Sequence, residues 1–305
     1  MNKNLLFSSL IFIGIVSLYS LYGFSDQFIF LNVRLPRLLL TIMVGMILSG
    51  VGSNFQILLN NPLAEPYILG VSSGAALAGI VAGLLGMSFL APLFGFTGAI
   101  VSILIVWSLS RIGGHIDKVK LLFSGFIYGM FTSSIISFLM YINQKDVGTI
   151  LPVLMGNLAH IFTHAEWIAF LISFCLAIIA LIYLSFQSGA LNIMASSEDA
   201  AQTMGVDVKK LRRNIFIIGS LLTGLAVAYA GIIGFIGLII PHFVRMIVGA
   251  DQKKVYPYSL FYGASFLLIC DFLASHITVI ELPVGIITSF IGCPVFLYLL
   301  LLKKK

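Results

Sequence analysis

Apolar runs long enough to cross a bilayer follow one another along almost the whole 305-residue chain. A helix needs about 20 apolar residues to cross the hydrocarbon core. Such runs predict an all-α fold, a polytopic transmembrane helix bundle of about ten spans. The runs are Leu5–Phe24, Leu38–Leu59, Ile68–Gly86, Ser88–Ser110, Leu121–Ile142, Trp167–Phe186, Ile215–Gly231, Ile232–Val248, Tyr258–Ile277 and Pro283–Leu302.

The charge content excludes a soluble protein of this size. Only 9% of the residues are charged, 60% are hydrophobic, and the mean hydropathy is +1.10. So few charges cannot cover the surface of a soluble domain. No polar segment of domain size is left over, so residues 1–305 are expected to form one membrane domain. The first run, Leu5–Phe24, lacks a small-residue cleavage site and predicts a retained helix, not a signal peptide.

The basic residues predict how the chain is oriented. With ten spans and the N-terminus inside, only Arg34, Arg37 and Lys145 among the lysines and arginines fall on the outer side. Both termini then lie in the cytoplasm, as the positive-inside rule favours. Because the basic residues alternate with spans and form no single patch, the pI of about 9.2 does not indicate nucleic-acid binding.

The seventh and eighth runs share one apolar stretch of about 31 residues between Arg213 and Arg245. Read as one helix, this stretch would move the terminal lysines to the outer side, against the positive-inside rule. We therefore predict two spans with a turn near Gly231, Gly234 and Gly237, the second span being short or tilted. A short helix is also expected in the outer connection, within Ile150–Ile161.

The longest polar segment lies on the inner side and contains Ala195–Leu211. Ser196 or Ser197 can cap a helix that runs through Glu198 to Met204, and Gly205 can end it. A second short helix is expected to start near Asp207. The two helices could form a knob that fits a partner's groove, or they could be an ordinary amphipathic interfacial loop. The residues alone do not choose between these readings.

Two outer arginines, Arg34 and Arg37, flank Pro36 at the entry to the second span. Cations on this side need a partner, and arginine forms bidentate contacts with carboxylates. The partner could be a docked outer protein, or the arginines could bind lipid phosphate instead. On the inner side, the sequence NPLAEP at residues 61–66 breaks the helix. Broken backbone at membrane depth is tolerated where protein or a water-filled cavity surrounds it.

Several motifs together resemble the permease family of type II ATP-binding-cassette importers, which take up iron–siderophore complexes, haem and cobalamin. The resemblance covers nearly the whole chain in order. The motifs are RLPR at 34–37, NPLAEPYILGVSSGA at 61–75, SEDAAQTMGV at 197–206, GIIGFIGLIIPHFVR at 231–245 and ELPVGIITSFIGCPVF at 281–296.

The resemblance implies roles for particular residues. Arg34 and Arg37 would dock on carboxylates of an extracytoplasmic solute-binding protein. Ala195–Leu211 would be a pair of coupling helices that fits a cleft in a cytoplasmic ATPase dimer, with Glu198, Ala201, Met204, Gly205 and Val206 in the contact. The pathway and its inner gate would involve Asn61, Leu63, Asp117, Lys118 and Val119, and the fifth span, Leu121–Ile142, would line the pathway. On that span Tyr128 and Met130 could touch the solute, or they could make ordinary lipid or helix contacts. The family works as a dimer of permease subunits, homo- or heterodimeric, in the bacterial cytoplasmic membrane.

The chain also departs from the family pattern. Some relatives carry a further outer arginine between the ninth and tenth spans, where this chain has Ser275 and His276. The stretch before the sixth span reads Leu154–Asn157 and lacks the family's tryptophan. Asp271, an acid inside the ninth span, is expected to make a structural ion pair that orients helices, although an ionisable group at that depth is also a functional candidate.

Three classes of function fit such a bundle unequally. The chain has no GxxxxGK[ST] phosphate loop, so a permease that hydrolyses nothing itself and depends on a separate ATPase subunit leads. An ion-driven secondary transporter would need ionisable residues along a pathway, and only Asp271 qualifies. An intramembrane enzyme is disfavoured, because the sequence has no paired acid–base constellation at membrane depth.

No cofactor and no metal site is predicted. The solute is expected to be an iron–siderophore, with haem, cobalamin and oxyanions left open.

Overall fold

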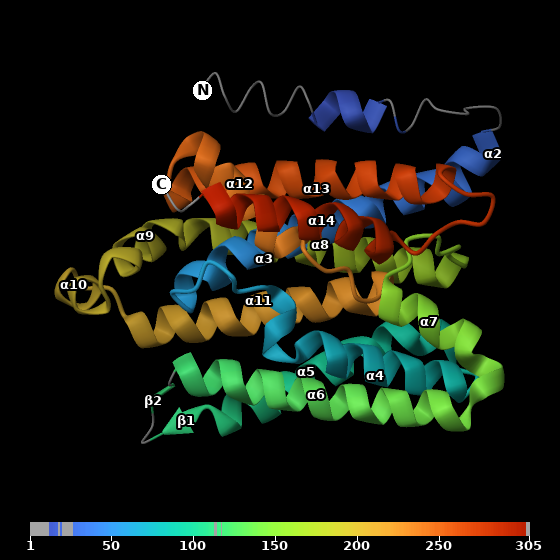
Figure 1. The fold of residues 1–305 in the computed structure, drawn as a ribbon, viewed down its shortest axis with the longest axis horizontal. Helices are drawn as coiled ribbons and strands as arrows, with labels where there is room; N and C mark the ends of the chain where they lie inside the picture. The colour runs from blue at the N-terminus through green and yellow to red at the C-terminus, as the bar shows by residue number, and fades with distance from the viewer. Residues whose placement is uncertain (1–11, 18, 20–26, 113–114, 117, 303–305) are drawn as a thin grey trace.

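The computed structural model describes residues 12–17, 19, 27–112, 115–116 and 118–302, and is a bundle of helices running along one long axis (Figure 1). The apolar runs become helices because each backbone hydrogen bond is then made within its own segment. The first helices are α2 (Gln27–Ile29), a π-helical turn (Phe30–Arg34), α3 (Leu35–Leu58), α4 (Val71–Leu84), α5 (Ala91–Leu109), α6 (Lys118–Ile142) and α7 (Val147–Met155).

The second half of the chain is helical in the same way. Its helices are α8 (His164–Phe186), α9 (Ser188–Ser196), α10 (Glu198–Thr203), α11 (Val208–Ala230), α12 (Ile236–Val248), α13 (Gln252–His276) and α14 (Val284–Leu302). Short 3₁₀ turns are Pro66–Leu69, Ser88–Leu90 and Gln144–Asp146. Two two-residue strands, β1 (Arg111–Ile112) and β2 (His115–Ile116), pair antiparallel between α5 and α6.

Nine described helices coincide with nine of the predicted apolar runs. Six are long and apolar enough to cross a membrane, and three are shorter: Val71–Leu84, Ile236–Val248 and Val284–Tyr298. Of the first run, Leu5–Phe24, the structure describes only residues 12–17 and 19, which are helical. The terminal lysines predicted to lie inside fall outside the described residues. The predicted outer short helix is α7, which starts three residues earlier than expected and ends at Met155.

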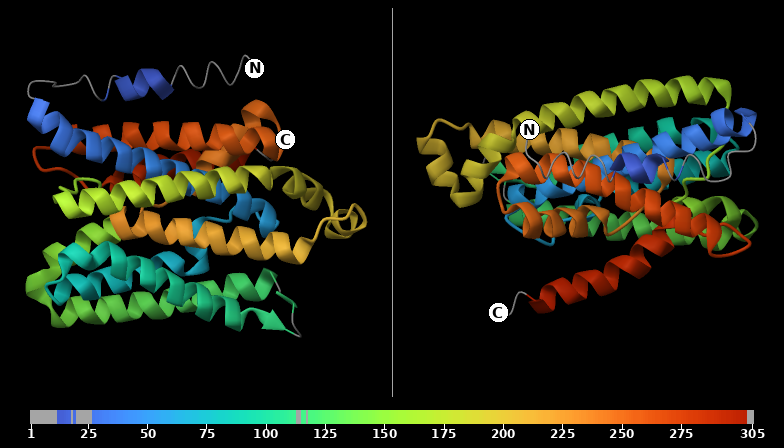
Figure 2. Two further views of the ribbon diagram at one scale, coloured as in Figure 1. Left: turned by 180° about the vertical axis from the view of Figure 1, so that it is seen from behind. Right: turned by 90° about the horizontal axis from the view of Figure 1, so that it is seen from above.

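Helix α3 is the centre of the bundle. In the most apolar window of the α2–α3 span, 83% of the residues are buried, against 22% for α6 and for α8. It crosses α13 closely because glycines face each other: a Cβ on Gly45 would lie 2.6 Å from the carbonyl oxygen of Gly263. Small residues allow this backbone approach in membrane bundles. Helices α6 and α14 pack at the periphery, and α14 diverges from the bundle toward its C-terminal end (Figure 2).

The two ends of the bundle differ. Helices α9 and α10 and the β1–β2 pair lie at one end, on the left in Figure 1, together with the C-terminal end of α14. Helix α10 projects furthest at this end. Helices α2 and α7 lie at the opposite end, on the right. The elements predicted to be inner and outer are thus separated along the long axis.

The seventh and eighth runs form two separate helices, but the break between them is longer than the predicted turn. Residues 231–235 are not helical, and Gly231 and Phe235 have φ angles of +69° and +72°. Gly237, which the sequence placed in the turn, lies inside α12. Phe235 is strained there, because a non-glycine residue rarely adopts positive φ.

Candidate translocation and coupling sites

The two broken segments, residues 61–70 and 231–235, contact each other inside the bundle. The backbone N–H of Phe235 donates to Oε1 of Glu65 over 2.5 Å, and the N–H of Ile233 donates to the hydroxyl of Tyr67 over 3.1 Å. These bonds give partners to backbone groups that no helix satisfies, as burial requires. The strained Phe235 is therefore held by Glu65, directly before α12 begins.

Close backbone packing joins the same two segments to α3. A Cβ on Gly52 would lie 2.2 Å from the carbonyl oxygen of Gly237, and a Cβ on Gly237 would lie 2.6 Å from Cδ of Pro66. The predicted break at 61–66 is thus wedged between α3 and α12. The three elements are packed so tightly that movement of one should displace the others.

The predicted pathway residues of the first break, Asn61 and Leu63, lie shortly after the end of α3. The N–H of Leu63 donates to Oδ1 of Asn61 over 2.9 Å, so Asn61 shapes the turn. Leu63 is 43% exposed. Next to the second break lies a hollow of about 730 Å³, lined on one side by Ile232 and Gly234 and on the other by α14.

The predicted residues of the inner gate lie around the start of α6. Asp117 lies outside the described residues, and Lys118 is the first residue of α6. Val119 is 59% exposed. The structure therefore describes only one exposed side chain of this predicted gate.

Tyr128 and Met130 on α6 point in different directions. The hydroxyl of Tyr128 accepts a hydrogen bond of 3.0 Å from Ser102 on α5. Its ring and hydroxyl lie against Gly70 and Gly74. Tyr128 thus packs between α4, α5 and α6 with its side chain partly buried, and a role for it along the pathway stays a prediction. Met130 is 58% exposed, among further exposed apolar side chains of α6: Phe123, Phe126, Ile127 and Phe131.

The outer arginines also differ from each other. Arg37 donates from Nε and Nη2 to Asp271 of α13 over 2.9 Å each, and from Nη1 to Glu281 over 3.1 Å. Asp271 is 1% exposed and Glu281 is 51% exposed. Asp271 also accepts a 2.5 Å bond from Tyr19. The prediction that Asp271 makes an ion pair orienting helices is confirmed.

The contacts with Asp271 and Glu281 leave little of the Arg37 guanidinium accessible to a docked protein. The guanidinium is 15% exposed and already contacts two carboxylates of its own chain. It therefore lies beneath the outer surface, tying α3 to α13 and to the loop that precedes α14. Arg34, one turn earlier, is half-buried in the π-helical turn. Of the two predicted docking residues, Arg34 lies nearer the outer end of the bundle.

The predicted inner knob has one short helix where two were expected. Ser197 caps α10 by accepting from the N–H of Ala200, and Gly205 follows the helix with φ of +83°. Asp207 caps the next helix through the N–H of Lys210, but that helix is the start of the long α11. The prediction of a separate second helix was wrong, because no residue that breaks a helix follows Asp207 before the membrane span.

Helix α10 and the turn after it carry one buried and one exposed apolar residue. Ala201 is fully buried, whereas Met204 is 69% exposed and Val206 is half-buried. Glu198 accepts a 2.6 Å hydrogen bond from Nη2 of Arg212, which fixes α10 to α11. Met204, which directly follows the short helix, thus lies exposed at the end of an element that Glu198 and Arg212 fix to α11.

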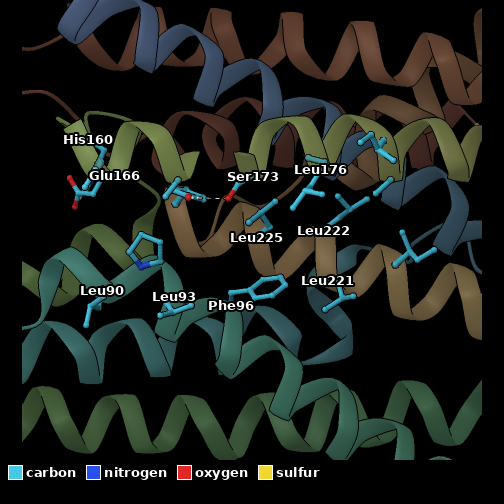
Figure 3. A pocket seen from close by; sticks show the side chains of 18 of the residues that line it. Leu90, Leu93, Phe96, His160, Glu166, Ser173, Leu176, Leu221, Leu222 and Leu225 are labelled. Atoms are coloured by element: carbon cyan, nitrogen blue, oxygen red, sulfur yellow. Dashed lines mark hydrogen bonds and ion pairs between the residues drawn. The ribbon is translucent and has the colours of Figure 1, made fainter. Parts of the chain in front are cut away.

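A second cavity was missed by the sequence reasoning. It has a volume of about 680 Å³ and lies between α5, α8 and α11, lined mainly by apolar side chains (Figure 3). Within it Ser173 and Tyr229 share a hydrogen bond of 3.2 Å. His160 and Glu166 lie at one end, and burial lowers the pKa of His160. No sequence signal indicates this cavity, because its lining comes from helices far apart in the sequence and most of the lining side chains are apolar.

Comparisons with known proteins agree with this arrangement. The model of the FecCD transport family matches residues 5–302. An uncharacterised ABC transporter permease protein, YvrB of Bacillus subtilis, is 39% identical over 288 residues, covering 91% of this chain and 80% of YvrB.

Named transporters are also among the relatives. The hemin transport permease HmuU of Yersinia pestis is 35% identical, covering 91% of this chain and 84% of HmuU. The cobalamin import permease BtuC of Halobacterium salinarum is 35% identical, covering 88% of this chain and 72% of BtuC.

One solved structure is similar over almost its whole length. It is an inward-facing ABC transporter described as of metal-chelate type, with a TM-score of 0.86, 30% identity and coverage of 98% of this chain and 99% of that one. The motifs, the broken helices and the matched family model lead to the same conclusion. The chain is a multi-pass membrane protein and belongs to the FecCD transport family of ABC importer permeases.

Proposed function

We propose that this chain is the membrane-spanning subunit of an ATP-driven importer and forms, with a second permease subunit, the pathway for a metal chelate, foremost an iron–siderophore complex. The observation that carries the proposal is the braced, projecting α10 with its exposed Met204, on a chain of this family. Such a helix suits the cleft of a partner protein. Residues 1–305 would form a single permease domain in the bacterial cytoplasmic membrane.

ATP hydrolysis is assigned to a separate cytoplasmic ATPase dimer. The sequence contains no GxxxxGK[ST] phosphate loop. The contact with the ATPase would be made by α10 and the turn after it. Its proposed residues are Glu198, Ala201, Met204, Gly205 and Val206, with the buried Ala201 supporting the others from below.

Docking of an extracytoplasmic solute-binding protein is proposed at the opposite end of the bundle. Arg34 would meet a carboxylate of that protein directly, since guanidinium pairs with carboxylates in a bidentate geometry. Arg37 remains a docking candidate through Nη1, which now contacts the exposed Glu281. Its buried contact with Asp271 would hold it in place.

The pathway is proposed along the exposed face of α6 and the two helix breaks. Asn61, Leu63 and Met130 are the described candidates that face out of the packed core, together with Val119 at the inner gate. Asp117 and Lys118 are kept as gate candidates from the family resemblance. Tyr128 would act behind this surface by fixing α6 against α4 and α5.

The exposed apolar side chains of α6 support the proposed class of solute. Phenylalanines and Met130 suit a large, partly apolar chelate better than a bare ion or a hydrated oxyanion. Relatives are named for haem, for cobalamin and, in Helicobacter pylori, for iron chelatin. Haem, cobalamin or oxyanion import by the same machinery are the alternatives. Ion-driven transport has less support, because Asp271 is already paired with Arg37.

The test is reconstitution of the chain in proteoliposomes with its cognate ATPase subunit and solute-binding protein. Uptake of radio-iron loaded on a siderophore should require ATP and both partners, and should exceed uptake of haem, cobalamin or molybdate. The purified chain alone should hydrolyse no ATP. Uptake that persists without the ATPase subunit, driven by a proton or sodium gradient, would refute the proposal.

A further inference from the structure

Asparagine and glutamine side chains connect four helices at the end of the bundle where α10 projects. The first connection is made by Asn192 of α9. Its Nδ2 donates to Oδ1 of Asp251 over 2.6 Å, and its Oδ1 accepts from the backbone N–H of Gln252 over 2.6 Å. One side chain thus uses both its donor and its acceptor on the N-terminus of α13. Asp251 in turn caps α13 through the N–H of Lys253.

The second connection leads from α13 to α3. The side chain of Gln252 is fully buried, and its Nε2 donates to Oδ1 of Asn54 over 2.8 Å and to Oγ of Ser53 over 3.1 Å. Asn54 and Ser53 are fully buried as well. Burying a polar side chain costs free energy unless it is hydrogen-bonded, so these bonds offset the burial. Gln252 therefore fixes the inner end of α13 to α3.

The third connection leads from α3 to α12 and the helix breaks. Nε2 of Gln56 donates to the carbonyl oxygen of Gly237 over 3.1 Å. Arg245 of α12 donates to Oε1 of Gln56 and to the carbonyl oxygen of Ser53. Gly237 packs against Pro66 in the first break. The series of contacts thus ends beside the break at 61–66.

The series begins beside α10. Ser197 alone separates the end of α9 from the start of α10. Helix α9 packs on α3, α10 and α13. A displacement of α10 therefore reaches α9 first, and Asn192 is the side chain of α9 that is hydrogen-bonded to α13.

The side chains of Asn54 and Gln252 could form a second hydrogen bond in addition to the one that they share. Oε1 of Gln252 and Nδ2 of Asn54 are buried and have no hydrogen-bond partner among the described residues. They are an acceptor and a donor on the two side chains that already share one hydrogen bond. A small shift of α13 along α3 could replace the bond from Nε2 of Gln252 to Oδ1 of Asn54 with one from Nδ2 of Asn54 to Oε1 of Gln252. Coupling between sites needs an element with two such discrete arrangements.

We propose that Asn192 and Gln252 are positioning residues that transmit movement of α10 through α13 and α3 to the two helix breaks. The inference rests on the proposed function, because it takes α10 as the contact with the ATPase. It adds the route by which ATPase closure reaches the pathway. Neither residue touches the solute or ATP in this scheme.

The experiment measures solute transported per ATP hydrolysed in proteoliposomes containing the complete complex. Asn192→Ala and Gln252→Leu should each lower this ratio about fivefold or more, the size of a typical coupling between sites. ATPase association and basal hydrolysis should stay within about twofold of wild type. The matched control is Asn214→Ala, which removes a 2.9 Å bond between α11 and α8 outside the series and should leave the ratio unchanged.

A double-mutant cycle tests the connection itself. If the two residues act in one series, combining the variants should lower the ratio little more than either alone. Asn192→Asp, which keeps the shape but loses the donor to Asp251, replaces Asn192→Ala if that variant does not assemble. An unchanged ratio in assembled Asn192 and Gln252 variants, or an equal loss in Asn214→Ala, would overturn the inference. A wild-type complex in which ATP drives no transport would instead refute the proposed function.

Discussion

At the scale of single residues, Arg37 pairs with one buried acid, Asp271, and one exposed acid, Glu281. The side chains of Arg37 and Asp271 are largely removed from solvent, at 15% and 1% exposure, whereas Glu281 is 51% exposed. Breaking a buried pair leaves a charge without a partner and costs about 3–5 kcal/mol, while an exposed pair contributes about 0–1 kcal/mol. The two acids that hold the same guanidinium should therefore differ sharply in their effect on stability.

We expect Asp271→Ala to lower the free energy of unfolding of the detergent-solubilised protein by about 3–5 kcal/mol. Glu281→Gln should cost less than about 1 kcal/mol. Thermal unfolding of the two variants, followed by tryptophan fluorescence, measures both losses of stability. The double variant Arg37→Met with Asp271→Leu should recover most of the loss, because it removes both charges together. Equal effects of Asp271→Ala and Glu281→Gln would show that burial does not determine the energetics here.

At the scale of elements, close crossings of α3 hold the bundle together. Cβ atoms are excluded at the crossing with α13: one on Gly263 would lie 2.1 Å from Oγ of Ser49 and 2.5 Å from the carbonyl oxygen of Gly45. Backbone cannot yield as a flexible side chain does. Elsewhere glycine is not required, since a Cβ on Gly83 of α4 would meet nothing within 4 Å.

The expected result is that Gly263→Ala destabilises the protein by about 1–3 kcal/mol, the usual cost of overpacking. Gly83→Ala should be neutral or slightly stabilising, because alanine is the better helix former. Both variants change the same atoms in a helix, so a thermal-shift comparison isolates the crossing. A neutral Gly263→Ala would mean that α3 and α13 can separate without cost.

The elements also show what could be predicted from the sequence. The apolar runs, the break at 61–66 and the cap at Ser197 were visible because each has a local chemical cause. The orientation of Tyr128 was not, since α6 is apolar on most sides and gives no facing signal. The bond between Glu65 and Phe235 joins residues 170 positions apart, so no local pattern contains it. The continuation of Asp207 into α11 was missed because its cap resembles the start of any helix.

At the scale of the whole molecule, the two proposed partner contacts lie at opposite ends of the bundle (Figure 1). Arg34 lies in the π-helical turn before α3, and Met204 lies after α10. The packed core between them includes α3 along most of its length. Direct effects of one contact on the other are therefore not expected, and any coupling must pass through the bundle.

This separation gives a prediction with two independent readouts. Arg34→Glu should weaken binding of the solute-binding protein and flatten its salt dependence, since an attractive charge becomes a repulsive one. It should leave binding of the ATPase subunit unchanged. Met204→Glu should weaken binding of the ATPase subunit, because it places a charge in an apolar contact. It should leave binding of the solute-binding protein unchanged. Surface plasmon resonance on nanodisc-embedded protein, with each partner over a salt series, measures the affinity of each variant for each partner.

If Arg34→Glu leaves docking of the solute-binding protein unaltered at every salt concentration, the outer contact lies elsewhere. If Met204→Glu leaves ATPase binding unaltered, α10 is not the inner contact, and the two assignments are thus judged separately.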